Sequence, residues 1–220
     1  MYICRMLRDE TSVKIADFLL QIKAIKLNVQ KPFTWASGLR SPVYCDNRVS
    51  LSYPRIRTFI RQELAHAVEG NFGKPDVIAG VATAAIAQGV LVAEALGLPF
   101  VYVRSSPKTH GLGNLIEGEV KAGQTALVIE DLVSTGQSSL KAVESLRDAG
   151  CEVKGMIAIF SYGFKSAAEN FKKSKCRLVT LTNYEIVIHR AIENNYVSEK
   201  DLKTLRAWRE NPEEWSKSIE

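Results

Sequence analysis

A short apolar run that ends in two acids and a small polar loop constrains the fold of this chain more than any other feature. Residues 126–129 read Ala-Leu-Val-Ile, which is typical of a strand buried in a parallel sheet. Glu130 and Asp131 follow at its expected carboxyl end, where open α/β sheets bind ligands. Residues 134–138 then bring hydroxyl and backbone N–H groups to the start of an expected helix, which is a favourable place for a phosphate.

The two carboxylates restrict which ligand can bind at this point. They would repel a bare phosphate, so we expect them to face sugar hydroxyls or a metal ion while the loop holds a phosphate nearby. A phosphorylated ribose fits that layout. The alternative is an ordinary strand, turn and helix in which Ser and Thr only cap the helix. That alternative leaves two acids at a buried strand end without a partner, which is costly.

Strand-like and helix-like segments alternate through most of the chain. The expected strands cover residues 76–80, 100–104, 126–130, 153–160 and 177–181. The expected helices cover residues 11–26, 54–69, 83–96, 138–149 and 198–215. The alternation predicts an α/β fold with a doubly wound, mostly parallel sheet flanked by helices. Because no internal repeat or linker interrupts it, we expect a single domain over residues 1–220.

The composition is that of an ordinary globular protein. Of the 220 residues, 46% are hydrophobic and 24% are charged, and no apolar run approaches the roughly 18 residues of a membrane span. Residues 1–8 are too charged for a signal peptide. The four cysteines lack metal-ligand spacing, so we expect them to stay reduced in the cytoplasm. The net charge of +5 is dispersed, which favours attraction of anionic small molecules over nucleic-acid binding.

A basic, glycine-rich segment follows the expected strand at residues 100–104. Residues 108–118 read Lys-Thr-His-Gly-Leu-Gly-Asn-Leu-Ile-Glu-Gly and show no helical or strand period. Loops of this kind suit lids that close over anionic substrates and exclude water. We therefore expect Lys108 and His110 to approach a bound anion, and a solvated surface loop is the alternative.

Three motifs, in order along residues 33–138, resemble the orotate phosphoribosyltransferase family of the type I phosphoribosyltransferases. Residues 126–138 resemble the motif that binds 5-phosphoribosyl 1-pyrophosphate (PRPP) across the type I enzymes. Residues 108–118 are similar to the orotate family's catalytic loop, Lys-x-His-Gly-x-Gly-Asn-x-Ile/Val-x-Gly. Residues 33–44 are similar to its N-terminal signature Phe-Thr-x-x-Ser-Gly-x-x-Ser-Pro-x-Tyr, where the base binds.

The resemblance implies a fold and a reaction. The implied fold is that of the type I phosphoribosyltransferases, with a small N-terminal hood from roughly 10–50 plus parts of the C-terminal region, over a core of roughly 51–182. The implied reaction transfers the 5-phosphoribosyl group from PRPP to orotate, giving orotidine 5′-monophosphate and pyrophosphate in pyrimidine (UMP) biosynthesis. Magnesium is the implied cofactor, held mainly by PRPP, with no side chain assigned as its ligand. A homodimer is also implied, in which the loop bearing Lys108 and His110 enters the partner's site.

The resemblance also implies roles for individual residues. The acidic pair binds the ribose hydroxyls, and the loop that follows wraps the 5′-phosphate. PRPP binding is implied for Thr83, Ala84, Arg104, Lys108, His110, Glu130, Asp131, Leu132, Val133, Ser134, Thr135, Gly136, Gln137 and Ser138. Catalysis is implied for Arg104, Lys108, His110 and Asp131. Orotate binding is implied for Ser134, Tyr44, Cys45 and Tyr162. Packing of small residues is the alternative at positions 83 and 84, and core packing is the alternative at position 162.

The chain departs from the family pattern at three positions. The best-known bacterial form has lysines where this chain has Ala36, Ala84 and Ser105. Arg40 or Lys31 is a candidate to supply the missing charge by another route. These departures leave two other functions open: transfer to a different base, such as a purine or uracil, and a non-catalytic regulator that senses PRPP.

Overall fold

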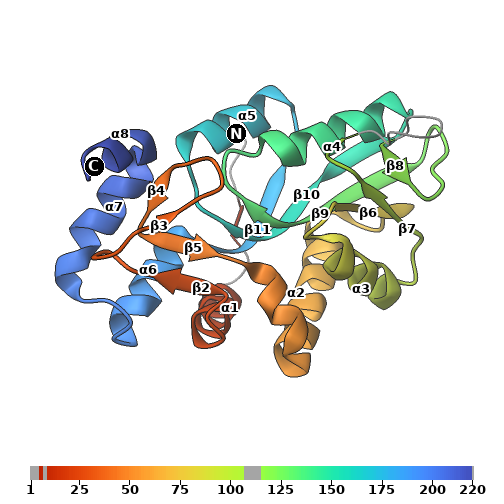
Figure 1. The fold of residues 1–220 in the computed structure, drawn as a ribbon. Helices are drawn as coiled ribbons and strands as arrows, with labels where there is room; N and C mark the ends of the chain where they lie inside the picture. The colour runs from red at the N-terminus through yellow and green to blue at the C-terminus, as the bar shows by residue number, and fades with distance from the viewer. Residues whose placement is uncertain (1–4, 7–8, 107–114, 220) are drawn as a thin grey trace.

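The computed structural model describes residues 5–6, 9–106 and 115–219, and its centre is a seven-stranded sheet (Figure 1). The strand order is β1-β11-β10-β9-β6-β7-β8. The parallel strands are β1 (Arg5–Met6), β6 (Val77–Val81), β7 (Phe100–Val103), β9 (Thr125–Val133), β10 (Glu152–Ser161) and β11 (Leu178–Asn183). Only β8 (Ile116–Glu117), at the edge, is antiparallel among the strands of this sheet that the structure describes. The predicted mostly parallel α/β sheet is confirmed.

Helices cover both faces of the sheet, which explains why its strands read as continuous apolar runs. On one face, Leu127 and Ile129 of β9 share a core with α1 (Asp9–Gln21), α2 (Pro54–Phe72), α3 (Ile86–Leu96) and α6 (Tyr184–Glu193). On the other face, Val128 shares a core with α4 (Gln137–Asp148) and α5 (Lys165–Lys173). Successive side chains of β9 thus point to opposite faces, and both faces are buried.

Several boundaries differ from the predicted ones for identifiable reasons. The first helix ends at Gln21 and not at 26, because β2 (Ile25–Leu27) pairs with β5 (Val43–Cys45). The predicted helix over 198–215 is broken into η2 (Glu199–Asp201), α7 (Leu202–Glu210) and α8 (Pro212–Lys217). The break lies at Asn211, whose φ of −146° is not helical, since a residue before proline disfavours the helical region. Its side chain then caps α8 by accepting the Glu214 N–H at 3.3 Å.

A smaller layer of short strands and C-terminal helices lies beside the carboxyl end of the sheet. It contains β2, β3 (Phe33–Thr34), β4 (Arg40–Ser41) and β5, with α7 and α8 against them (Figure 1). Trp35 packs edge-on against Trp208 with ring centroids 5.7 Å apart, and the Arg40 N–H donates to the Ser216 hydroxyl at 3.0 Å. In contrast, α1 packs against β11 and α6. We call this smaller layer, together with the segment from β5 into η1 (Asn47–Ser52), the hood. The prediction of one domain with a hood from roughly 10–50 stays a prediction.

None of the helices in the described part of the chain has the length and apolar character needed to traverse a bilayer.

Candidate active site

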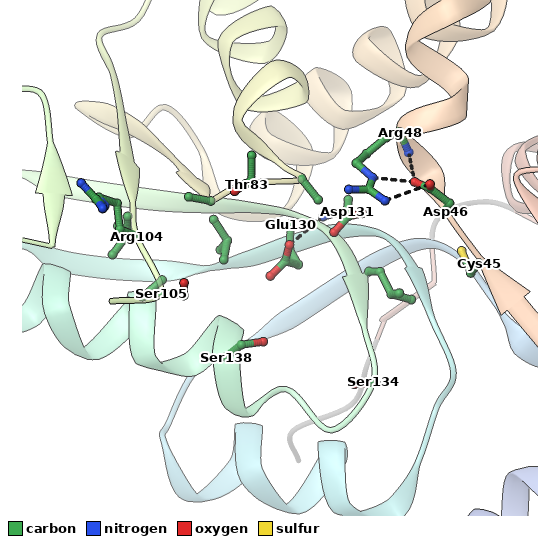
Figure 2. Close-up of a pocket in the computed structure, with 16 residues that line it drawn as sticks. Cys45, Asp46, Arg48, Thr83, Arg104, Ser105, Glu130, Asp131, Ser134 and Ser138 are labelled. Carbon is green, nitrogen blue, oxygen red and sulfur yellow. Dashed lines mark hydrogen bonds and ion pairs between the residues drawn. The ribbon is translucent and has the colours of Figure 1, made fainter. Parts of the chain in front are cut away.

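A cavity of 360 Å³ opens where β6, β7 and β9 end (Figure 2). The hood contributes to it through the segment after β5. Its lining consists of Cys45, Asp46, Arg48, Val81, Ala82, Thr83, Ala84, Val103, Arg104, Ser105, Glu130, Asp131, Leu132, Ser134, Ser138 and Ala142. The acidic pair, the small-residue loop after β6 and the start of α4 therefore surround one space, as expected for ligand sites of open α/β sheets.

The two neighbouring acids have different environments. Glu130 is only 4% exposed; one carboxylate oxygen accepts the Ser139 hydroxyl at 2.7 Å and the other accepts the Asp131 N–H at 3.0 Å. Burial, with the Asp131 charge beside it, holds the pKa of Glu130 well above its usual value. Burial also raises the pKa of Asp131, while the Glu130 hydrogen bond and the Arg48 charge oppose that rise. The structure therefore fixes Glu130 inward and leaves Asp131 as the more available carboxylate.

The loop between β9 and α4 has the features of a phosphate site. Gly136 adopts a φ of +78°, and a Cβ at this position would lie 2.6 Å from the Phe171 ring. Among the described residues, no side chain caps the N-terminus of α4. The first backbone N–H groups of this helix are therefore available to bind an anion. Ser134 and Ser138 line the cavity on either side of the turn (Figure 2). Asn170 braces the loop from outside by donating to the Thr135 carbonyl at 2.9 Å.

Arg104 lies at the opposite end of the cavity from the hood (Figure 2). Its guanidinium is 3.3 Å from the Glu117 carboxylate, a pair that orients it at the cavity edge. Thr83 and Ala84, on the loop after β6, line the same cavity, and the Ala82–Thr83 peptide bond is cis. Lys108 and His110 lie outside the described residues.

The hood end of the cavity carries a second arginine. Two nitrogens of Arg48 donate to the two carboxylate oxygens of Asp46, at 2.7 and 2.9 Å (Figure 2). Burial raises the pKa of Asp131, and the Arg48 charge opposes that rise. Asn47, which lies between Asp46 and Arg48 in the sequence, donates a side-chain N–H to the Asp131 carbonyl at 2.6 Å. Among the described lining residues, Arg48 and Arg104 are the only cations, one at each end.

The structure gathers most of the predicted site residues, though not all of them. Thr135 faces a neighbouring cavity, and the Val133 side chain is buried in the core, so only its main chain could meet a ligand. Tyr44 is 37% exposed beside the Phe33 ring. Tyr162 is 2% exposed and stacks 5.4 Å from Phe164, within a cluster of aromatic rings. The base contact assigned to Tyr162 stays a prediction.

Sequence reasoning missed four residues that shape this site. They are Asp46, Asn47, Arg48 and Ser139. The spacing of an acid and an arginine two residues apart, directly after the Tyr44–Cys45 signature, was the available signal for two of them. No sequence signal connects Asn47 to Asp131, because their contact spans 84 residues.

Comparison with known proteins gives one consistent family. A family model described as phosphoribosyl transferase domain matches residues 52–192. The chain is 57% identical to orotate phosphoribosyltransferase of Porphyromonas gingivalis over 201 residues, which is 91% of this chain and 96% of that protein.

Solved structures agree with that family. The orotate phosphoribosyltransferase of Mycobacterium tuberculosis, solved with Fe(III) dicitrate, matches with a TM-score of 0.66 and 26% identity, over 80% of this chain and 98% of that one. The UMP synthase of Leishmania donovani matches with a TM-score of 0.74 and 28% identity, over 90% of this chain. This chain spans 42% of the length of that synthase.

Proposed function

The chain belongs to the orotate phosphoribosyltransferases, within the phosphoribosyl transferase domain family, and from this premise we propose that the cavity at the ends of β6, β7 and β9 is where PRPP and orotate react. The chain transfers the 5-phosphoribosyl group of PRPP to orotate in pyrimidine biosynthesis and releases pyrophosphate. The observation that carries the proposed location is the meeting of the Glu130–Asp131 pair with the uncapped start of α4 in one cavity.

The geometry supports a division of PRPP among three parts of the cavity. The uncapped N-terminus of α4, with the Ser134 and Ser138 hydroxyls, receives the 5′-phosphate. Asp131 accepts hydrogen bonds from the ribose hydroxyls, while Glu130, already bonded to Ser139, holds the strand end in place. Arg104, with the loop bearing Thr83 and Ala84, receives the pyrophosphate.

These positions match the demands of the reaction. The bond from the ribose C1 to a pyrophosphate oxygen breaks, and the oxygen keeps the electron pair. A ring nitrogen of orotate bonds to C1 and gives up its proton to the departing pyrophosphate or to solvent. Arg104 offsets the charge that grows on the departing pyrophosphate, and the Glu117 carboxylate holds its guanidinium ready for that role. Fixing both reactants in one cavity removes much of the entropic barrier. We assign the acceptor to the hood end, beside Cys45 and Ser134.

We propose that the reaction uses Mg²⁺ carried mainly by PRPP. Within the described residues, no group of three or more His, Cys, Asp or Glu side chains is placed to hold a metal ion. Asp131 does offer a hard carboxylate oxygen at the ribose position, and Mg²⁺ binds well to one or two carboxylates together with substrate phosphates. When bound, the ion would neutralise charge on the pyrophosphate.

We also propose the homodimer and the shared loop that the family resemblance implies. The two ends of the loop are held at the cavity, because the Arg104 N–H donates to the Leu115 carbonyl at 2.9 Å. Lys108 and His110 lie between these ends, outside the described residues, and they would close over the partner's pyrophosphate. The expected cytosolic location stays a prediction.

The test is the loss of orotate absorbance on adding PRPP and Mg²⁺ to the purified protein. Adenine, hypoxanthine and uracil run in parallel. We expect rapid loss with orotate that excess pyrophosphate reverses. Turnover of another base without orotate turnover would keep the PRPP site and overturn the acceptor. Tight PRPP binding with no turnover of any of the four bases would favour a regulator.

A further inference from the structure

A buried amide links the acceptor side of the cavity to the ribose side. Asn47 is 1% exposed and begins η1 (Asn47–Ser52), directly after the Cys45–Asp46 segment. Its Nδ2 donates to the Asp131 carbonyl at 2.6 Å. Its Oδ1 accepts the Cys45 thiol at 3.4 Å. One side chain therefore bridges two cavity-lining residues that lie on different layers of the fold.

Asn47 is itself held from behind. The main-chain carbonyl of Asn47 accepts a hydrogen bond from the Ser50 hydroxyl at 2.6 Å. The Ser50 oxygen in turn accepts one from Gln88 Nε2 at 3.2 Å. Ser50 and Gln88 are both buried, and Gln88 belongs to α3. Gln88, Ser50 and Asn47 thus form a buried chain of hydrogen bonds that runs from α3 to β9, and the Asn47 side-chain amide is its last member. Such rows fix one arrangement when their members are bonded to one another.

The residues on either side of Asn47 act on the same strand end. Asp46 holds Arg48 through two hydrogen bonds, and the Arg48 charge acts on the Asp131 carboxylate. Asn47 thus holds the main chain of Asp131, and the Arg48 charge favours the ionised form of its carboxylate. Both residues act on β9 from a segment that is far from it in sequence.

We propose that Asn47 is a positioning residue that sets Asp131 and the acceptor-binding end of β5 relative to each other. The inference rests on the proposed function in that Asp131 is taken to hold the ribose. Without the amide, the Asp131 carbonyl loses its buried donor and the two half-sites are no longer tied. A displacement of about 1 Å at reacting groups costs about 100-fold in rate, so we expect Asn47→Ala to lower kcat/KM for PRPP about 10- to 100-fold.

The first experiment compares Asn47→Ala with Asn71→Ala. Asn71 also bonds through its side-chain amide, donating to the Ala67 carbonyl at 3.0 Å, but it lies at the end of α2 and does not line the cavity. We expect only Asn47→Ala to weaken calorimetric binding of Mg·PRPP and to lower kcat/KM, with both variants folded by circular dichroism. Wild-type PRPP binding and turnover by Asn47→Ala, or equal losses in both variants, would overturn the proposal.

A second variant decides the matter even if Asn47→Ala fails to fold. Asn47→Asp keeps the shape but presents an acceptor to the Asp131 carbonyl unless the new carboxyl is protonated, when its O–H can donate. We therefore expect its kcat/KM, relative to wild type at the same pH, to recover as the pH falls from about 8 to about 6, because burial raises the pKa of carboxyls. A ratio that stays constant or falls over this range would contradict the role.

The nearby titrating and charged groups are present in both proteins of that comparison. They are Cys45, Asp46 and Arg48 on the same segment, and Glu130 and Asp131 on β9. Their own titration is common to both proteins. The one added effect is an upward shift of the Asp131 pKa beside a new carboxylate, which would lower the ratio as the pH falls and so cannot produce the expected recovery. PRPP binding is measured without orotate, so a wild-type protein that binds PRPP but leaves orotate unchanged refutes the proposed function while the effect of Asn47 on binding is still read.

Discussion

At the scale of single residues, two adjacent carboxylates have been given different tasks by their surroundings. Glu130 has both oxygens bonded inside the protein, which holds it at the strand end, and its assigned contact with PRPP stays a prediction. Asp131 keeps its side chain toward the cavity (Figure 2). The distinction follows from the alternation of side chains along a strand, which turns neighbouring residues to opposite sides. It makes Asp131 the residue whose charge should matter for PRPP.

Asp131→Asn should therefore lower kcat/KM for PRPP about 10- to 100-fold, since hydrogen bonds to charged groups contribute about 1.5–3 kcal/mol. The change is nearly isosteric, so the melting temperature should stay close to that of wild type. Steady-state kinetics with PRPP varied measure the effect. Asp148→Asn, an exposed position on α4, is the matched control and should leave the kinetics unchanged. Wild-type kinetics in Asp131→Asn would refute the assignment.

Arg48→Met should change how activity depends on pH. Burial raises the pKa of Asp131 and the Arg48 charge opposes that rise, so removing Arg48 raises the pKa further. The ionised form of Asp131 is the better acceptor for ribose hydroxyls, and it is lost as the pH falls through this pKa. The acid-side decline of kcat/KM for PRPP should therefore begin at a higher pH in Arg48→Met. Arg55→Met, which removes an exposed arginine outside the cavity, controls for net charge and should not move the decline.

At the scale of elements, the turn between β9 and α4 depends on a residue without a side chain. Gly136 combines a left-handed φ with a close approach to Phe171 of α5. Gly123, in the turn before β9, has a similar φ of +86° but open space around it. Alanine substitutions at the two glycines therefore separate two contributions to the loss of stability: the left-handed backbone conformation, which both share, and the steric clash with Phe171, which only Gly136 has.

Gly123→Ala should cost about 1 kcal/mol of unfolding free energy, which is the left-handed penalty alone. Gly136→Ala should cost about 2–4 kcal/mol, because overpacking adds about 1–3 kcal/mol to that penalty. It should also raise KM for PRPP, since the start of α4 must shift. Denaturant unfolding and kinetics on both variants measure the two effects. Equal stability losses would show that the Phe171 contact is relieved without cost.

The strands and helices that local sequence patterns predict are present in the structure. The errors in their boundaries occur where pairing with another strand decides whether a residue belongs to a strand. The acid-tipped strand was expected to end at 130, yet β9 runs to Val133 because Leu132 and Val133 pair with Phe160 and Ser161 of β10. The apolar pattern stops at the acids, so sequence shows no reason for the strand to continue. The short strands β2 and β5 likewise form because they pair with each other. The sequence pattern places β2 at the end of a predicted helix.

At the scale of the whole molecule, the site was predictable where its parts are contiguous in sequence. The acids, the turn and the start of α4 lie within nine residues of each other, 130–138, so one segment predicts their chemistry. Asp46, Asn47 and Arg48 were missed because their roles arise only when the hood is folded onto β9. Folding brings those residues to Asp131 through tertiary contacts that no local period encodes.

The proposed dimer makes a prediction that single-subunit chemistry cannot. If the loop acts in trans, a heterodimer of Lys108→Ala and Asp131→Asn subunits has one site with both defects and one with neither. Equal mixing by chance makes about half of the dimers mixed, so about a quarter of all sites carry neither defect. The blend of two impaired proteins should therefore recover about a quarter of wild-type activity above their own residual level. If the loop acts in cis, every site keeps one defect and nothing is recovered. Co-refolded mixtures, with heterodimers verified by differential tags, give the measurement, and a verified heterodimer with no activity above that of the two single variants would refute the shared site.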